Sequence, residues 1–488
     1  MTDAALHPWP WKTAVLLLAL SVFLLGRKLD FNGYVHADEP NKVHQITQDK
    51  YNFNHPLLML HSVKLYAEAT GISGDYDRVI RAGRWSSVIF CSLAVALLVL
   101  VTGRLHGSFV AGAAGMLVLF TPLFYELAHY FKEDPALIFG LSLSLLAMQV
   151  YGEKPCWQRA AFLGAACGIA VSAKYTGLII LPFAAYAVLA ARRKLDLAGL
   201  TFFALLAFAL VNLPMISSPE VWKSRVDLEV SRLNAVDVPN PRKIPHGEYF
   251  TVFYKYASPF VLCLIGAYLY GVWKRKFRLS AAEWTVLLLP AAYLVLLCFI
   301  STKTERYILP ASVFLACVAA AGLGPVLNLK HGKIAAVFLL AAALIWQMPR
   351  VYELDSIFSS KRHEEVMQYL ETGLPSPAKV LVDNYQTLSP QRKPEPVIKQ
   401  RTLQPHETLD SLQRDGFTHV LVTGKRYPVF SPDSRRSSGL TPEQDAKMRH
   451  LYDELFRRSS LVFEWQRGRS KQLEPEFRLY ELPKPDSQ

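Results

Sequence analysis

Charged residues and cysteines are scarce in this chain of 488 residues, and both shortages narrow the class of protein. Only 19% of the residues are charged whereas 51% are hydrophobic, and the hydrophobic residues form long runs instead of recurring at amphipathic spacing. This pattern indicates a polytopic membrane protein. The six cysteines lie in or beside the runs and none lies in the long C-terminal part, so the sequence suggests neither a disulfide framework nor a zinc site.

Other features that would point elsewhere are also missing. The net charge of +13 is not accompanied by a basic and aromatic module, which disfavours binding to nucleic acid. No small-residue cleavage site follows the first apolar run, so we expect this run to be a span rather than a signal peptide, with Trp9 and Trp11 as its interfacial anchor. The chain has no internal repeat, a feature that transporters more often show.

Eleven apolar runs are candidates for membrane-spanning helices. Several are shorter than the roughly 20 residues that cross a bilayer, so their ends must include flanking residues or lie inside the bundle. The candidate spans are Thr13–Gly26, Trp85–Thr102, Ser108–Tyr125, Ala136–Tyr151, Ala160–Ala173, Gly177–Ala191, Leu197–Ile216, Ser258–Trp273, Trp284–Ser301, Ile308–Leu329 and Ile334–Met348.

Lysine and arginine gather in alternate connections between these runs. The positive-inside rule places such connections in the cytoplasm. The N-terminus is then also inside, and an odd number of spans puts the C-terminal part outside. The connections concerned contain Arg104, then Lys154 and Arg159, then Arg192–Lys194, then Lys274–Arg278, and finally Lys330 and Lys333.

The predicted architecture is an α-helical polytopic membrane bundle of about 11 transmembrane helices with a small extracytoplasmic α/β C-terminal domain. We expect residues 1–348 to form the transmembrane module, with outer loops at 27–84 and 217–257, and residues 349–488 to form the α/β domain. In this tail, the strand-like runs "AKVLVDN", "THVLVTG", "SLVFEWQ" and "FRLYEL" accompany a helical run from Pro442 to Arg458.

Charged residues recur in four short segments that this topology places at the outer mouth of the bundle. Each has an ordinary explanation when taken alone, such as a lysine that snorkels to the interface or an acidic helix start followed by proline. Together, two acidic clusters and three cations converge on one face of the membrane, where carboxylates suit a base and cations suit a phosphate. Transfer from a phosphate-linked donor requires this combination. The segments are "HADEPNK" (36–42), "HYFKEDP" (129–135), "SAKYTG" (172–177) and "STKTERYILP" (301–310).

The sequence resembles the GT-C glycosyltransferases, which take a sugar from a polyprenyl phosphate, and is similar to the protein O-mannosyltransferases and the lipid A aminoarabinose transferase. No "WWD" tripeptide occurs, which argues against an oligosaccharyltransferase, and the tail is too short for the β-trefoil insert of the eukaryotic mannosyltransferases. The tail looks like the outer domain of bacterial members, which implies a bacterial inner membrane protein. The resemblance spans nearly the whole chain and rests on Asp38, Glu39, Asp134, Lys174, Arg306 and Tyr307.

The resemblance implies a role for these residues. Asp38 would take a proton from the acceptor hydroxyl as the hydroxyl attacks the anomeric carbon, with Glu39 in support. Asp134 would orient the acceptor or hold a sugar hydroxyl. The lipid phosphate would leave from the opposite face, which inverts the anomeric centre, and cationic side chains would stabilise its charge. The implied donor-phosphate site consists of Lys174, Lys303, Arg306 and Tyr307.

Several points stay open. A divalent metal is conceivable, but the histidines of the first outer loop match no ligand pattern, so we expect no cofactor and no metal site. The sugar is a hexose or a pentose, and the acceptor is lipid A, another glycan or a protein. The competing hypotheses are a transporter or flippase for lipid-linked sugars and a non-enzymatic accessory subunit of a glycan assembly complex. The histidines are His36, His44, His55 and His61.

Overall fold

The computed structural model describes residues 7–29, 36, 38–234, 258–276, 278–300, 305–383, 388, 396–424, 426–431, 440–468 and 475–483. Contacts divide the chain into two compact units. The larger unit contains the described residues of Met1–Leu29, Lys42–Asn234 and Lys243–Leu354, and the smaller unit contains those of Asp30–Asn41 and Asp355–Gln488. The boundary falls inside two helices, α2 (Glu39–Thr47) and α18 (Gly332–Ile357).

The described chain is mostly helical, and each of the eleven predicted runs is helical over most of its described length, which confirms the helical bundle. By length and composition, five described segments could cross a membrane, and a bent pair of helices would make a sixth. The other apolar helices have 10–17 residues, so the number of spans stays a prediction. The five segments are Tyr76–His106, Glu133–Glu153, Ala281–Cys298, Glu305–Leu327 and Gly332–Thr372.

The remaining helices of the larger unit follow the apolar pattern of the sequence. They are α1 (Trp11–Leu25), α3 (Leu58–Ala69), α4 (Tyr76–His106), α5 (Ser108–Leu119), α6 (Pro122–Ala128), α7 (Glu133–Glu153), α8 (Trp157–Ala173), α9 (Ile180–Ala190), α10 (Asp196–Val211), α11 (Leu213–Ile216), α12 (Pro219–Asn234), α14 (Pro259–Lys274), α15 (Ala281–Cys298), α16 (Leu309–Ala321) and α17 (Leu323–Leu327). Two 3₁₀ turns, η1 (Tyr175–Ile179) and η2 (Glu305–Ile308), precede α9 and α16.

Three of the predicted runs are divided into two α-helices, and one of them, Ile308–Leu329, divides at Gly322 between α16 and α17. The run Ser108–Tyr125 bends by 64° between α5 and α6, and the run Leu197–Ile216 divides at Asn212 between α10 and α11. In these last two runs a proline, Pro122 or Pro214, lies in the first turn of the second helix. Proline is tolerated there because the first N–H groups of a helix have no partner within it, but its ring disfavours helical backbone at the residue before it.

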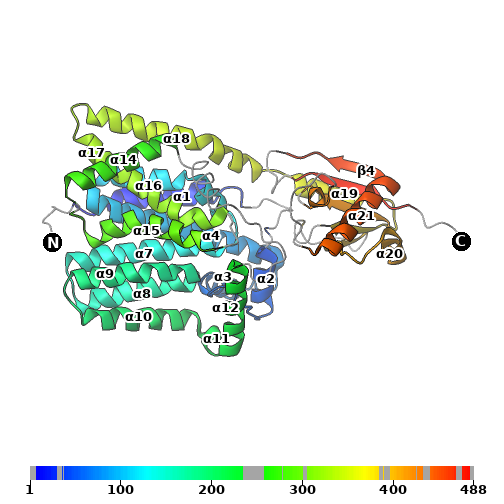
Figure 1. Ribbon diagram of the computed structural model, residues 1–488, viewed down its shortest axis with the longest axis horizontal. Coiled ribbons are helices and arrows are strands. Elements are labelled where there is room, and N and C mark those ends of the chain that lie inside the picture. Colours follow the sequence, from blue (N-terminus) through cyan, green and yellow to red (C-terminus); the bar gives the residue numbers. More distant parts are fainter. Residues whose placement is uncertain are drawn as a thin grey trace. The chain divides into compact units, whose positions relative to one another are not determined.

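Helices α7 to α10 lie side by side (Figure 1), and glycines allow α8 to approach α10 closely. A Cβ atom on Gly164 would lie 2.3 Å from the carbonyl oxygen of Leu200, and one on Gly168 would lie 2.4 Å from that of Ala204. Small residues at such contacts give the close packing that holds helices together where lipid removes the hydrophobic driving force. Because α7 and α8 are consecutive and antiparallel, the start of α7 and the end of α8 lie at the same end of the bundle.

The smaller unit contains a five-stranded sheet in the order β2-β1-β3-β5-β4. Strand β1 pairs in parallel with β2 and β3, whereas β5 pairs antiparallel with β3 and β4. This confirms the small sheet predicted for the tail, although β2 was not foreseen. The strands are β1 (Lys379–Asp383), β2 (Val397–Gln400), β3 (His419–Thr423), β4 (Ser460–Trp465) and β5 (Phe477–Glu481).

Helices cover both faces of this sheet. On one face, α20 (Leu409–Arg414) and α21 (Pro442–Arg458) bury apolar residues against Val420 and Val422. On the other face, α19 (Arg362–Thr372) packs on Val380, Val382 and Leu421. The alternation follows from strand geometry, since successive side chains point to opposite faces. Helix α21 has the predicted bounds because Thr441 and Gln444 form a capping box and Pro442 occupies the first helical position.

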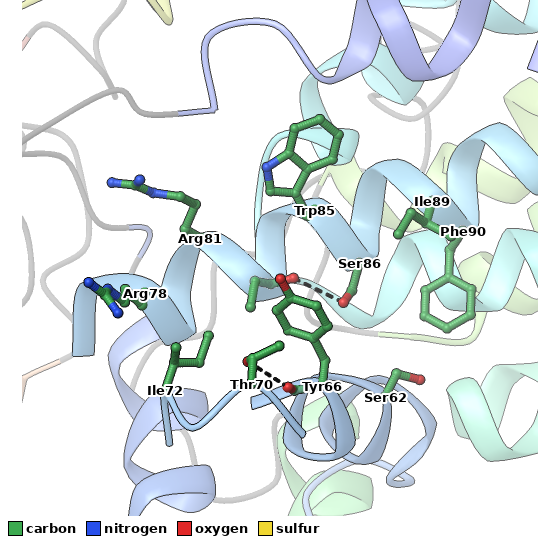
Figure 2. Close-up of a pocket in the computed structure, with 11 residues that line it drawn as sticks. Ser62, Tyr66, Thr70, Ile72, Arg78, Arg81, Trp85, Ser86, Ile89 and Phe90 are labelled. Atoms are coloured by element: carbon green, nitrogen blue, oxygen red, sulfur yellow. Dashed lines mark hydrogen bonds between the residues drawn. The ribbon is translucent and has the colours of Figure 1, made fainter. Parts of the chain in front are cut away.

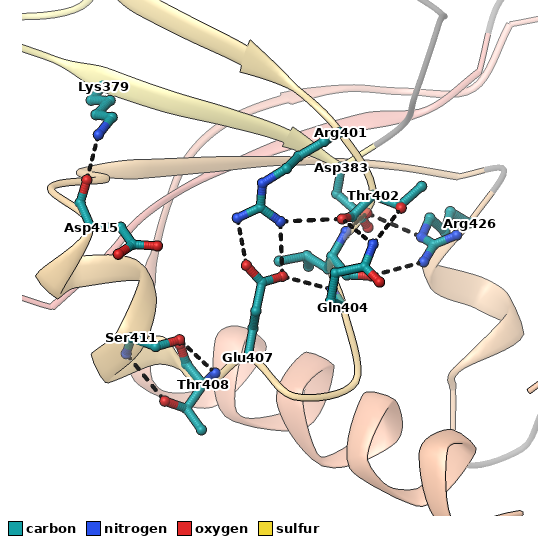
Figure 3. Close-up of polar contacts among 11 residues, drawn as sticks. Lys379, Asp383, Arg401, Thr402, Gln404, Glu407, Thr408, Ser411, Asp415 and Arg426 are labelled. Atoms are coloured by element: carbon teal, nitrogen blue, oxygen red, sulfur yellow. Dashed lines mark hydrogen bonds and ion pairs between the residues drawn. The ribbon is translucent and has the colours of Figure 1, made fainter. Parts of the chain in front are cut away.

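A buried carboxylate fixes the carboxyl end of β1 (Figure 3). The Asp383 side chain has no exposed surface, and its Oδ1 accepts a hydrogen bond of 2.8 Å from the Leu403 N–H. The Tyr452 hydroxyl donates to its Oδ2, and the Arg426 Nε lies 3.1 Å from Oδ1. A buried charge is tolerated when it is paired and hydrogen-bonded, so Asp383 joins β1, α21 and two loops in one network.

Candidate active site

The predicted carboxylate of α7 and the predicted cation after α8 meet in the larger unit. The Lys174 Nζ lies 2.7 Å from the Asp134 Oδ1, and the two side chains are only 12% and 3% exposed. Asp134 is in the first turn of α7, and Lys174 follows the last residue of α8. The antiparallel packing of α7 and α8 brings these two positions together, and the N-terminus of α7 favours a negative charge there.

A second buried ion pair lies beside the first. The Lys42 Nζ of α2 is 2.9 Å from the Glu133 Oε1, with side chains 5% and 8% exposed. Adjacent acidic residues therefore bind two different lysines, one from each side of the start of α7. Both Lys42 and Glu133 belong to the charged segments noted in the sequence, but that analysis did not single them out because their pairing depends on the tertiary fold.

The ring of Tyr307 lies within cation–π distance of two cations near Asp134. The Lys174 Nζ is 5.2 Å from the centre of the Tyr307 ring, and the Arg306 guanidinium carbon is 5.6 Å from it. These are cation–π distances, and they place the "RY" pair of η2 beside Lys174. Lys303, the other predicted phosphate-binding residue, lies outside the described residues.

Asp134, Lys174 and Tyr307 line a small pocket together with other polar and apolar side chains. The cavity volume is about 80 Å³. Ligand pockets more commonly have about 300–1,000 Å³, so the present form accommodates a small group and not a whole sugar-lipid. The polar lining residues include Asn54, His55, Asp134, Lys174 and Glu229, and the apolar or aromatic ones include Leu137, Tyr293, Leu296, Leu297 and Ile300.

Side-chain hydrogen bonds hold the wall of this pocket. The Tyr175 hydroxyl donates to the Phe53 carbonyl oxygen at 3.3 Å and accepts from the Trp222 Nε1–H at 3.0 Å. Buried Asn212 accepts from the Leu57 N–H at 2.8 Å and donates to the Ser172 Oγ at 3.0 Å. Neither Tyr175 nor Asn212 was predicted from the sequence to hold the pocket. The sequence feature that could have identified Asn212 is a single amide side chain directly after the apolar residues that end at Val211.

The imidazole of His55 faces this pocket in its neutral form. Burial lowers the pKa of His55 below its ordinary value of 6.5, the Glu133 carboxylate opposes this shift, and the Lys174 ammonium group adds to it. A neutral imidazole offers one donor and one acceptor to a ligand. Among the described residues, no group of three or more His, Cys, Asp or Glu side chains is arranged to hold a metal ion.

The "HADEP" segment separates its two carboxylates. Glu39 is buried and its Oε2 accepts a hydrogen bond of 2.8 Å from the His36 N–H, whereas the Asp38 side chain is 43% exposed. The His36 Nδ1 lies 4.0 Å from the Asp38 Oδ2 and accepts from the Asp38 N–H at 3.2 Å. Glu39 thus stabilises the turn that contains Asp38, whose side chain is partly exposed. Both belong to the smaller unit, and neither is among the residues that line the pocket of the larger unit.

Part of the larger unit matches a known family in sequence. Residues 70–220 match the family described as dolichyl-phosphate-mannose-protein mannosyltransferase. This stretch includes Asp134 and Lys174. A comparison with curated proteins finds no match.

The fold as a whole is similar to that of solved enzymes. The structure of ArnT from Cupriavidus metallidurans bound to undecaprenyl phosphate matches with a TM-score of 0.57 at 14% identity, over 95% of this chain and 97% of that one. The structure of the archaeal oligosaccharyltransferase AglB from Archaeoglobus fulgidus, with an inhibitory peptide and a dolichol-phosphate, matches with a TM-score of 0.52 at 11% identity, over 93% of this chain and 80% of that one. The chain therefore has an ArnT-like fold, and the resemblance noted in the sequence is confirmed at the level of the fold.

Proposed function

We propose that this chain with the GT-C fold is an inverting glycosyltransferase of the bacterial inner membrane. It moves a sugar from a polyprenyl-phosphate-linked donor to an acceptor hydroxyl on the extracytoplasmic side. The observation that carries the proposal is the pocket in which Lys174 and Asp134 form a buried ion pair and which apolar side chains also line. Undecaprenyl phosphate and dolichol-phosphate, the ligands in the ArnT and AglB structures, have the polar and apolar ends that such a pocket suits.

The donor phosphate would replace Asp134 as the partner of Lys174. A lysine that is already 2.7 Å from a carboxylate has its charge compensated in the empty pocket, so an arriving phosphate exchanges one anion for another instead of entering an uncompensated site. Arg306 and Lys303 would add charge to hold the phosphate as the glycosidic bond breaks. The carboxylate of Asp134, once released, is free to orient the acceptor or a sugar hydroxyl.

The chemical step is a single displacement. The acceptor oxygen forms a bond to the anomeric carbon while the bond from this carbon to the phosphate oxygen breaks, and the polyprenyl phosphate leaves with the electron pair. Asp38 takes the acceptor proton, which requires a carboxylate that an acceptor can reach, and the 43% exposure of this side chain meets that requirement. Glu39 supports the turn.

Purified protein and a set of undecaprenyl-phosphate-linked sugars test this function. We expect release of undecaprenyl phosphate from at least one hexosyl or pentosyl donor, and loss of release in Lys174→Ala. Lys223→Ala, which removes an exposed lysine of α12, is the matched control and should keep the activity. Well-folded wild-type protein that cleaves none of these donors, with or without lipid, glycan and peptide acceptors, would contradict the proposal. Cysteine labelling of the tail in intact cells tests the sidedness.

A further inference from the structure

A large groove lies between α3 and about the first four turns of α4, and it is separate from the pocket of Lys174. Its cavity volume is about 790 Å³, and its walls include Tyr66, Arg78, Arg81, Trp85, Ile89 and Phe90. We call it the α3–α4 groove. Figure 2 shows the two arginines at one end and Ile89 with Phe90 at the other. Among the described residues, the groove and the pocket share no lining residue.

One face of α4 forms a graded wall of the groove. Arg78, Arg81, Trp85 and Ile89 are separated by three, four and four residues, so they follow one another along the same side of the helix. From the N-terminal end of α4, this side of the helix carries two arginines, then the indole of Trp85, then the aliphatic side chain of Ile89. With a rise of about 1.5 Å per residue, about 12 Å separates Arg81 from Ile89 along the helix axis.

The α3 wall consists of one aromatic ring, that of Tyr66, between two hydroxyl residues. Ser62 and Thr70 lie four residues before and after Tyr66, and their hydroxyls donate to the backbone oxygens of Leu58 and Tyr66 at 2.7 and 2.8 Å. These hydroxyls are therefore already satisfied, which leaves the ring of Tyr66 as the main feature of this wall. Tyr66 is 54% exposed and Ile89 is 50% exposed, so the groove is open along its length.

The gradient along α4 fits the depth profile of a membrane surface. Helix α4 is one of the segments long and apolar enough to cross a bilayer, and its apolar stretch begins at Trp85. Tryptophan is enriched at the level of the lipid headgroups, so Arg78 and Arg81 lie at or above this level and Ile89 below it. An occupant of the groove meets cations at its outer end and hydrocarbon at its inner end.

We propose that the α3–α4 groove binds one phospholipid with an anionic headgroup. The guanidinium groups of Arg78 and Arg81 bind the headgroup phosphate, and an acyl chain lies along Trp85, Ile89 and Phe90 against Tyr66. Arg78 also lies 3.2 Å from the Asp75 carboxylate, but a guanidinium has five N–H donors, so it binds a carboxylate and a phosphate together. Two arginines at one end distinguish this groove from an ordinary lipid-facing surface, which selects for no headgroup.

Lipid bound in this groove would stabilise the segment of the chain that supplies Asn54 and His55 to the pocket. Helix α3 begins at Leu58, directly after the segment that supplies Asn54 and His55 to the pocket. A lipid that fills the hollow between α3 and α4 limits the movement of α3 and so holds this segment in place. The site is thus a stabilising lipid site, separate from the donor pocket.

Native mass spectrometry of the full chain with phosphatidylglycerol tests the proposal. We expect one tightly held phosphatidylglycerol, weaker binding of phosphatidylcholine, and a loss of about tenfold in affinity for each arginine removed in Arg78→Ala and Arg81→Ala. Lys223→Ala is the control for loss of an exposed charge. Ile89→Trp, which fills the inner end, should also weaken binding, whereas Leu205→Trp on the exposed face of α10 should not.

Three results would overturn the proposal. Equal binding of phosphatidylcholine would show that the headgroup is not recognised. Unchanged binding in the double arginine variant, with the same melting temperature as the wild type, would place the lipid elsewhere. Displacement of phosphatidylglycerol by an equal amount of undecaprenyl phosphate would identify the groove as part of the donor site. Binding that survives Lys174→Ala would support a separate site, whether or not the protein transfers sugar.

Discussion

The ammonium group of Lys174 lies 2.7 Å from the carboxylate of Asp134, and both side chains are nearly buried. An ion pair in such a place is poor evidence for stability, because the cost of removing two charges from water offsets much of their attraction. It is better explained as a preformed cation site, in which the carboxylate stands in for an anionic ligand.

Removal of Lys174 should therefore affect stability and activity in different ways. Lys174→Ala leaves the Asp134 charge buried without its main partner, at a cost of about 3–5 kcal/mol in the free energy of unfolding. Lys174→Met combined with Asp134→Leu removes both charges and should regain most of this stability while donor cleavage stays absent. Thermal unfolding in detergent measures the first effect and undecaprenyl phosphate release the second. A double variant as unstable as Lys174→Ala would contradict the interpretation of the pair.

The wall of the pocket depends on Asn212. Asn212→Ala leaves the Leu57 N–H without its acceptor, and a buried group left unpaired costs about 1–3 kcal/mol. The Ser172 Oγ loses a donor but still donates to the Gly168 carbonyl oxygen. We expect a lower melting temperature and a higher KM for the donor. Hydrogen exchange at residues 50–57 provides the local measurement, and faster exchange there is the expected sign. Unchanged exchange with a lower melting temperature would mean that Asn212 stabilises α10 alone.

The lowered pKa of His55 predicts how stability depends on pH. Below its ordinary pKa of 6.5, the unfolded chain binds a proton at this imidazole more readily than the folded protein does, so stability should fall as pH decreases. The melting temperature of the wild type should drop between about pH 7.5 and about pH 5.5, and His55→Gln should reduce the drop. His61→Gln serves as a comparison, since burial also lowers the pKa of His61. An equal drop in His55→Gln and wild type would exclude His55 as its source.

In the smaller unit, Tyr452→Phe should loosen the end of β1. The variant loses a hydrogen bond to the buried Asp383 carboxylate, which contributes about 1.5–3 kcal/mol. Faster hydrogen exchange in β1 and α21 of the full chain is the expected outcome. Tyr369→Phe is the matched control, because Tyr369 of α19 makes its contacts with Phe463 and Trp465 through its ring. Equal effects of the two variants would rule out a special role for the Asp383 network.

The sequence predicted the helices better than their breaks and partners. Long apolar runs give a strong signal because a bilayer requires every backbone group to be satisfied within a segment, so all eleven runs became helices. The bend at Pro122 and the break at Asn212 were missed, since composition does not distinguish one bent run from one straight run. Strand β2, Val397–Gln400, was missed because it is short and half-exposed, without the buried apolar run that marked β1 and β3.

The site was predicted as a set of residue types rather than as a geometry. Asp134, Lys174 and the "RY" pair were selected by resemblance, and the structure places Asp134, Lys174 and Tyr307 in the lining of one pocket, with Arg306 near the Tyr307 ring. The pairing of Lys42 with Glu133 could not be predicted, because it joins α2 to α7 through packing that no local pattern encodes. The different exposure of Asp38 and Glu39 also depends on the turn and not on the residue types.

The most direct test of the account is the rate of sugar transfer by purified Asp38→Asn compared with Glu39→Gln. Asp38→Asn keeps the size of the side chain but removes the base, so transfer should fall by about 10²- to 10⁴-fold while expression and donor binding persist. Glu39→Gln should have a smaller effect on transfer, because its side chain is buried and its carboxylate already accepts the His36 N–H. Transfer by Asp38→Asn at the wild-type rate, with the donor bound as before, would contradict the role of this loop in catalysis.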